Sequence, residues 1–449
     1  MKAEGSPRPD DLFVMPYRDG RFCLYAPLRR SAAVVNSATV AAVRKYLDGK
    51  MASATAAEQA VVAGLKERGL IGGDLPSAPV FPANYAFRPH EVTLFLTSRC
   101  NLRCLYCYAD AGRKSVDMDW DCAKAAIDLV STNAGLLGAP RFGIGFHGGG
   151  EPTVAWKMLV RATRYAKARG NRLGLTPDLY AATNGLLDKR QAKFLARHFS
   201  SINVSLDGPA DIQDRNRPTV AVKGSFDIVA NTLDTFSEAG VRYGIRATVT
   251  STTAPRMVEI VEALLARFTP DFLHLEPSWF CGRCTTTGEQ PPPDEQFVRL
   301  FKEATARGEE LGSKVTYSGA RLDMLTSKFC AAPGDGFSVL PEGLVTSCYE
   351  ITDDDDPRAS LFHYGRYDPE SGEFAFDQQR LDDLRNLSVD KLEHCQDCFC
   401  KWHCAGDCLA KALDGSAEHQ GSMRCELNRS LTMAQLEKVL ERQEGMTDD

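Results

Sequence analysis

Three closely spaced cysteines in the first third of the chain have the spacing of a metal site. Cys100, Cys104 and Cys107 are separated by three and then two residues in "TLFLTSRCNLRCLYCYADAG", directly after an apolar, strand-like run. Thiolates at this spacing can bind three corners of an iron–sulfur cube and leave the fourth iron without a protein ligand. An open position on a bound metal is typical of a catalytic site. The alternative is a zinc site, although no nearby residue offers a fourth ligand with motif spacing.

The composition of the chain narrows the class of protein. The 449 residues, 43% hydrophobic and 25% charged, are ordinary for a soluble protein of two to four domains. A net charge of −6 argues against a nucleic-acid binder, and neither a signal peptide nor a membrane-spanning run is evident. We therefore expect a cytoplasmic protein with no nucleic-acid or membrane partner. Cytoplasmic thiols stay reduced, so fifteen cysteines, ten of them at or after Cys281, predict metal ligation rather than disulfides.

Strands and helices alternate around the first cysteine loop, and this alternation predicts a parallel sheet covered by helices. Too few repeats are present for a closed eight-stranded barrel, so we expect an α/β fold built on a partial (β/α)6 barrel. Chemistry in such folds lies at the carboxyl ends of the strands, where the cysteine loop falls. The predicted strands are 91–97, 142–149, 178–185, 202–208, 243–250 and 271–277.

Other segments flank the predicted barrel, which we place at 90–285. A hairpin, a third strand and two helices predict a small α+β N-terminal domain at 1–75, followed by a proline-bearing linker at 76–89. A linker or helical bridge at 286–329 leads to a cysteine-rich, cluster-binding domain at 330–430. A C-terminal helix and tail at 431–449 complete the expected organisation.

The C-x3-C-x2-C loop, with the aromatic Tyr106 before its last cysteine, resembles the signature of radical S-adenosylmethionine (SAM) enzymes. In that family the open iron binds SAM, and one electron from the cluster cleaves it to a 5′-deoxyadenosyl radical that takes a substrate hydrogen atom. The resemblance implies SAM and a 4Fe–4S cluster as cofactors. It also implies a flavodoxin- or ferredoxin-type electron donor.

Residues at successive predicted strand ends match further elements of this family. The "GGEP" after the second strand resembles the element that holds the SAM amino group, and glycines there let the backbone approach a ligand. Small polar side chains after the third and fourth strands suit ribose hydroxyls and a carboxylate, and an arginine can clamp a carboxylate. The candidate SAM contacts are Tyr106, Gly149, Gly150, Glu151, Pro152, Thr183, Asn184, Ser205, Asp207 and Arg217.

The later cysteines resemble the seven-cysteine SPASM pattern, which usually carries two auxiliary 4Fe–4S clusters. By this resemblance one cluster is bound by Cys395, Cys398, Cys404 and Cys425, and the other by Cys330, Cys348 and Cys408. The chain would then hold three clusters, with a double zinc knuckle as the alternative. The second auxiliary set lacks a fourth ligand. Its vacant place is open or is filled by Cys281, Cys284, Cys400 or Asp335.

The N-terminal segment resembles PqqD-like domains, which bind leader peptides, although a simple packing domain is the alternative. An edge strand there could take an extended peptide by strand addition. We therefore expect a radical SAM peptide maturase that acts on a ribosomally made precursor peptide and installs a crosslink or another oxidative modification. Glu276 and His274, at the sixth strand end, are candidate catalytic residues by position.

Two other functions fit the same sequence. One is an activator like the sulfatase-maturing members of the family, which oxidise a Cys or Ser to formylglycine. The other is a non-catalytic iron–sulfur electron-transfer protein, which would not cleave SAM.

Overall fold

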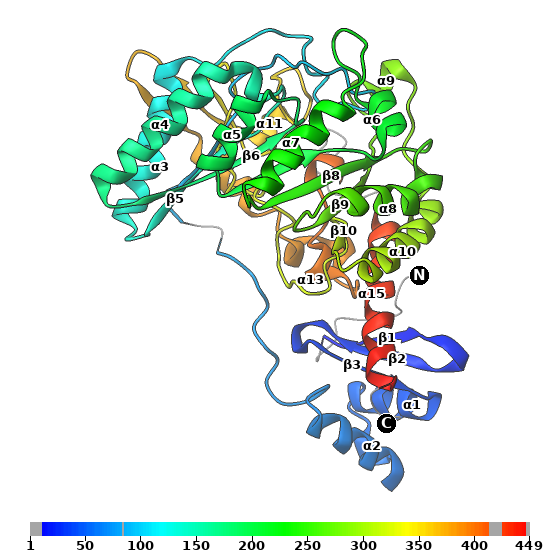
Figure 1. Cartoon of the computed structure of the whole chain (residues 1–449). Helices are drawn as coiled ribbons and strands as arrows, with labels where there is room; N and C mark the ends of the chain where they lie inside the picture. The colour runs from blue at the N-terminus through cyan, green and yellow to red at the C-terminus, as the bar shows by residue number, and fades with distance from the viewer. Residues whose placement is uncertain (1–10, 83–84, 413–423, 446–449) are drawn as a thin grey trace.

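A small N-terminal unit, a parallel barrel and a cysteine-rich region follow one another along the chain (Figure 1). The structure, a computed structural model, describes residues 11–82, 85–412 and 424–445. Four segments of the predicted domains lie outside the described residues. They are 1–10 of the N-terminal domain, 83–84 of the linker, 413–423 of the cluster domain and 446–449 of the tail. Among the helices described, none has the length and apolar character needed to cross a membrane.

The barrel wall contains the six predicted strands, which pair in parallel and in chain order. They are β4 (Glu91–Leu94), β5 (Arg141–Phe146), β6 (Thr176–Thr183), β7 (Ser201–Ser205), β8 (Tyr243–Val249) and β9 (Leu273–Pro277). The predicted partial α/β barrel is therefore confirmed.

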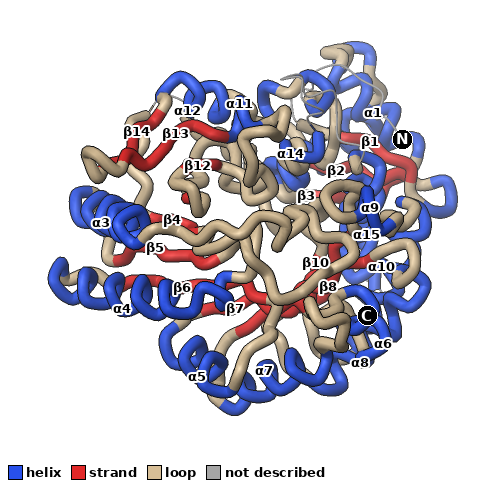
Figure 2. Tube along the Cα trace, turned by 90° about the horizontal axis from the view of Figure 1, so that it is seen from above, coloured by secondary structure: helices blue, strands red, loops and turns tan. Residues whose placement is uncertain are grey.

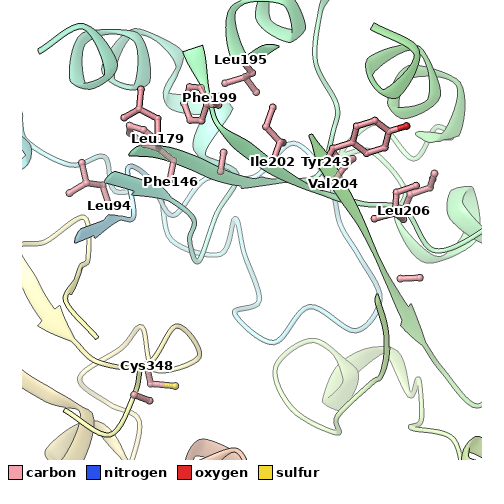
Figure 3. Close-up of a cluster of buried hydrophobic side chains, with 14 of the residues drawn as sticks. Leu94, Phe146, Leu179, Leu195, Phe199, Ile202, Val204, Leu206, Tyr243 and Cys348 are labelled. Carbon is pink, nitrogen blue, oxygen red and sulfur yellow. The ribbon is translucent and has the colours of Figure 1, made fainter. Parts of the chain in front are cut away.

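Helices cover the outer face of this wall, as Figure 2 shows in a view from above. They are α3 (Trp120–Leu136), α4 (Trp156–Leu173), α5 (Lys189–His198), α6 (Ala210–Asn216), α7 (Phe226–Glu238) and α8 (Met257–Arg267). Alternate strand residues such as Ile202 and Val204 are buried in the core beneath the helices (Figure 3). The intervening residues, including Ser205 and His274, are left to face the barrel interior, because successive side chains of a strand point to opposite faces.

The barrel sheet continues beyond both of its edges. After α10 (Asp294–Glu310), β10 (Val315–Thr316) pairs with β9, and β11 (Ser338–Val339) pairs with β4. Three antiparallel strands follow β11: β12 (Leu344–Thr346), β13 (His363–Asp368) and β14 (Glu373–Phe376). One eleven-stranded sheet therefore crosses the domain boundary predicted at 330.

The cysteine-rich region contains short helices and one long one. The short ones are α9 (Cys284–Thr287), α11 (Ala359–Phe362), α12 (Gln378–Arg385), α13 (Lys401–Cys404) and α14 (Leu409–Ala412). The long helix, α15, spans Cys425–Gly445, so the start predicted at 431 is too late. The Asn428 amide donates to the Arg424 carbonyl (2.8 Å), which begins the helix at the last cysteine.

The N-terminal unit has the predicted content, with antiparallel β1 (Phe13–Pro16), β2 (Phe22–Ala26) and β3 (Ser31–Val35). Two helices follow, α1 (Ser37–Leu47) and α2 (Ala56–Glu67). Side chains of this sheet, including Phe13 and Met15, pack against Leu436 and Leu440 of α15. The unit is thereby docked on the C-terminal helix, as Figure 1 also shows.

Candidate active site

Backbone contacts hold the first cysteine loop at the carboxyl end of β4. The Arg103 amide donates to the Pro218 carbonyl (2.8 Å) and the Leu105 amide to the Asn216 carbonyl (2.9 Å), which ties the loop to the segment after α6. Burial raises the pKa of the Cys100 thiol to about 11 and that of Cys104 to about 12. Ligation at this loop must therefore displace thiol protons, as is general for cysteine metal sites.

Two of the predicted SAM contacts stand directly beside these cysteines. Asn184 Nδ2 lies 3.9 Å from Cys100 Sγ and 2.7 Å from Asn101 Oδ1. Arg217 Nη1 lies 3.7 Å from Cys104 Sγ. Both residues are buried. Hydrogen bonds of this kind to cysteine sulfur tune an iron–sulfur cluster, so the structure brings together a loop and donors that fit one.

Asp207 holds two other predicted residues in place. Its buried carboxylate pairs with Arg217 Nε (3.0 Å) and accepts hydrogen bonds from the Thr248 amide (3.1 Å) and Asn216 Nδ2 (3.2 Å). The Tyr106 hydroxyl donates to the same carboxylate. The Arg217 guanidinium lies 5.2 Å from the centre of the Tyr106 ring. These contacts orient Tyr106 and Arg217 and leave Asp207 with a positioning role.

The Glu151 carboxylate is likewise satisfied inside the protein. It accepts hydrogen bonds from the Thr183 hydroxyl (2.8 Å), the Asn184 amide (2.7 Å) and the Thr153 hydroxyl (2.7 Å). Glu151 thereby joins the loop after β5 to the end of β6. The backbone of Gly149, in the loop after β5, lines a cavity.

The remaining predicted SAM contacts occupy the ends of neighbouring strands. A Cβ on Gly150 would stand 2.2 Å from the Arg99 carbonyl oxygen, so only glycine fits this approach of two loops. Pro152 begins a short 3-10 helix, Pro152–Ala155, and Ser205 is the last residue of β7.

Glu276 and His274, the candidate catalytic residues, belong to a buried ion network. Glu276 Oε1 pairs with Arg424 Nη1 (2.6 Å), and Arg424 pairs with Asp407 (2.5 Å). Ser318 Oγ lies 2.7 Å and His274 Nε2 2.9 Å from Glu276 Oε2. Although burial opposes it, the His274 hydrogen bond and the Arg424 charge hold the pKa of Glu276 well below its usual range. A general base needs a pKa near the working pH, so these contacts favour a structural role for Glu276.

Cys404 belongs to the first auxiliary set that the resemblance implied, with Cys395, Cys398 and Cys425. Besides burial and Asp407, charges on Cys398, Cys395 and Cys425 raise the pKa of Cys404, which also accepts a hydrogen bond from Asn428 Nδ2 (3.2 Å). Within the described residues, no group of three or more His, Cys, Asp and Glu side chains has the arrangement of a metal-ion site.

The second auxiliary set that the resemblance implied comprises Cys330, Cys348 and Cys408. Burial is the largest cause of the raised pKa of Cys348, and charges on Cys408 and Cys330 add to it. A cavity of about 200 Å³ lies between residues that follow the first cysteine loop and residues that follow Cys348, and its lining includes Tyr108, Gly149 and Glu350. Burial first, and then charges on Cys107, Glu350 and Cys348, raise the pKa of Tyr108.

Several residues of this region were missed by the sequence analysis. Tyr349, next to Cys348, stacks on His147 with ring centres 4.6 Å apart, and its hydroxyl lies 3.0 Å from that of Thr93. Lys411, three residues after Cys408, is buried beside Glu350. Both residues lie within a few positions of a predicted cysteine ligand. The segment around such a ligand is expected to be buried, so a charged residue in it, such as Lys411, is the sequence signal that could have identified this position.

Comparison with known proteins finds a family match for the barrel segment. The model of the Radical SAM superfamily matches residues 94–264. The Fe-coproporphyrin III synthase of Methanosarcina barkeri is 30% identical over 48% of this chain and 52% of its own length. The mycofactocin maturase MftC of Mycolicibacterium smegmatis is 28% identical over 50% of this chain and 53% of its own.

Two further matches are longer. The serine-type anaerobic sulfatase-maturating enzyme of Klebsiella aerogenes is 22% identical over 78% of this chain and 85% of its own length. The solved structure of anSMEcpe with bound AdoMet and Cp18Cys peptide superposes with a TM-score of 0.62 at 19% identity, covering 79% of this chain and 99% of that one. At this identity the superposition speaks for the fold alone.

Residues 94–264 of the chain match the Radical SAM superfamily. The chain spans about half the length of several curated relatives that it matches. The family implies SAM and a 4Fe–4S cluster as cofactors. The first cysteine loop, with its flanking donors and its close glycine, fits that pair.

Proposed function

We propose that this protein is a radical SAM peptide maturase of the SPASM type. The proposal rests on the first cysteine loop, Asn184 and Arg217, which lie together at the carboxyl ends of the parallel strands. Asn184 stands beside Cys100, and Arg217 beside Cys104, in a loop that holds a third cysteine. This edge is where α/β sheets of this kind bind their ligands.

When bound, the cluster and SAM supply a 5′-deoxyadenosyl radical that removes a hydrogen atom from the substrate. Cys100, Cys104 and Cys107 would hold the cluster through three of its irons. The half-buried backbone at Gly149 would receive the SAM amino group, and Arg217, fixed by Asp207, offers a cation suited to its carboxylate. The two later cysteine sets would hold auxiliary clusters that remove an electron from the product radical.

A precursor peptide is the substrate that the N-terminal unit supports. Among the described residues β3 pairs with β2 alone, so its outer edge could take an extended peptide by strand addition. A groove of about 920 Å³ beside it is lined by Tyr25 and Ala32, by β10 and by α15. The groove reaches Thr316, whose hydroxyl lies 3.4 Å from His274 Nδ1 in the barrel.

The charge of this groove suits an acidic peptide. Five basic and two acidic side chains line it, namely Arg30, Lys314, Arg321, Lys438, Arg442, Glu309 and Asp323. A leader bound along β3 would therefore deliver the following residues toward the barrel interior. The bond formed in the peptide would be a crosslink or another oxidative modification.

A sulfatase-activating function is the second candidate, and the long match to the Klebsiella aerogenes enzyme favours it. It would oxidise a Cys or Ser to formylglycine without a leader. Removal of residues 1–75 would then leave activity intact, whereas a maturase would lose modification of its precursor.

The test of the proposed function uses anaerobically reconstituted protein. We expect about twelve irons per chain, and 5′-deoxyadenosine on addition of dithionite and SAM. A Cys100/Cys104/Cys107 triple alanine variant should retain about eight irons and release no 5′-deoxyadenosine. A fully loaded wild type that leaves SAM intact would instead identify an electron carrier.

A further inference from the structure

The segment that follows β9 contains a C-x2-C motif that the proposed function leaves unused. It reads "CGRC" from Cys281 to Cys284, where α9 begins. In the described sheet, β4 and β9 are separated by β5 to β8 and do not pair with each other. The loop after β4, which carries the first three cysteines, can therefore be joined to the end of β9 only by contacts outside the strand ladder. The C-x2-C segment supplies such contacts.

Arg283 makes four of these contacts. Its guanidinium donates from Nη1 to the Cys104 carbonyl (3.0 Å) and from Nη2 to the Ala111 carbonyl (2.7 Å). Nε pairs with Asp110 Oδ1 (2.9 Å), and the Arg283 amide donates to the Cys107 carbonyl (2.9 Å). The side chain is 12% exposed. Because a guanidinium presents its donors as a rigid planar fork, these bonds together select one arrangement of the loop backbone.

Two neighbours of Arg283 also contact the loop. A Cβ on Gly282 would stand 2.3 Å from the carbonyl oxygens of both Cys107 and Tyr108, and its φ of +52° is one that other residues rarely adopt. The Thr287 hydroxyl donates to the Leu105 carbonyl (2.8 Å). The segment thus reaches backbone carbonyls and one carboxylate of the loop, and these contacts occupy no cysteine thiol.

We propose that residues 281–287 form a clamp that positions the first cysteine loop, with Arg283 as its main positioning residue. This role rests on the proposed function, in which that loop binds the cluster and SAM. The loop would carry the iron, whereas Gly149 and Arg217, the expected contacts of the SAM amino and carboxylate groups, follow other strands. The clamp would therefore set the distance between the iron and these two groups, and small displacements of bound groups are costly.

Hydrogen exchange of the metal-free protein tests the clamp without any cofactor. Arg283→Gln should speed exchange of the amides of residues 100–112 about tenfold, because local opening costs less once the bonds of the fork are lost. Exchange in α3 should stay unchanged, which shows that the variant folds. Arg267→Gln, at an exposed pair with Asp234, is the control and should alter neither region. Unchanged exchange of the loop in Arg283→Gln would overturn the clamp.

A matched pair of threonines tests the clamp with little risk to folding. Thr286 and Thr287 are both exposed, and both hydroxyls donate to the Arg283 carbonyl (3.0 and 3.1 Å). Only the Thr287 hydroxyl has the additional bond to Leu105. We expect Thr287→Val to speed exchange of the loop by about two- to tenfold and Thr286→Val to leave it unchanged. Equal exchange in the two variants would contradict the clamp.

SAM binding by the reconstituted protein separates positioning from a merely structural role. Arg283→Gln should keep the iron content of the wild type and bind SAM about tenfold more weakly in equilibrium dialysis. Arg283→Lys, which keeps the charge but not the fork, should lie between the two. Unchanged SAM affinity despite faster exchange of the loop would overturn the positioning role. A wild type that takes up iron and binds no SAM would overturn the proposed function, while the exchange rates would still decide whether the clamp holds the loop.

Discussion

At the scale of single residues, the buried pair of Asp207 and Arg217 links the strand ends to the first cysteine loop. We predict that Asp207→Asn lowers the free energy of unfolding by about 3–5 kcal/mol, because it leaves the buried guanidinium without a counter-charge. Urea unfolding of the metal-free protein measures this. The control is Asp271→Asn, whose pair with Arg242 is largely exposed and should change stability by less than about 1 kcal/mol. Equal effects of the two variants would contradict the prediction.

Glu276 gives a prediction about pH at the same scale. The pKa of Glu276 lies below its usual range in the folded state, so the unfolded chain binds this proton more readily. Its stabilising contribution is therefore complete above the unfolded value of about 4.3 and is lost as the pH falls below it. We expect the stability difference between wild type and Glu276→Gln to be largest at neutral pH and smaller near pH 4. Urea unfolding at the two pH values measures it, and a difference that grows in acid would show the opposite linkage.

At the scale of elements, the loop after β5 must approach the loop after β4 very closely. We predict that Gly150→Ala abolishes SAM binding and lowers the melting temperature, because its Cβ would meet the Arg99 carbonyl, which is backbone and has little freedom to move. Gly135→Ala, in α3, is the matched control, since a Cβ there meets nothing within 4 Å. That variant should gain about 0.5–1 kcal/mol of stability. Equilibrium dialysis with SAM and thermal unfolding would show whether the two glycines differ.

At the scale of the whole molecule, the N-terminal unit is held against the rest of the chain by α15. Leu440 is 1% exposed there and packs with Phe13 and Met15. We predict that Leu440→Ala weakens this docking by about 2–5 kcal/mol and speeds proteolysis within residues 76–89. Limited proteolysis measures the rate, and Leu137→Ala, at a 51% exposed residue directly after α3, should leave it unchanged. Equal cleavage in both variants would mean that the interface does not hold the unit.

The sequence by itself determined the local pattern of this protein. The six strands of the barrel follow from short apolar runs, and the glycines and polar residues at their ends follow from the same register. Because parallel strands align their carboxyl ends, Asn184 and Arg217 could be expected near the cysteine loop before any coordinates were known. The cysteine sets came from spacing and from resemblance to a family. These features depend on neighbours in sequence or on the regular geometry of one sheet.

Only the tertiary structure decided the features that join distant segments. The ion pair of Glu276 with Arg424 spans 148 residues and places this candidate base in a buried ion network. The hydrogen bond between Tyr25 and His403 spans 378 residues and connects the N-terminal unit to the residue before Cys404. The ion pair of Glu350 with Lys411 likewise forms only because folding brings two distant turns together. The hydrophobic periodicity of a sequence does not predict such contacts. The packing of whole elements determines how deeply each side chain is buried and which charges lie near it.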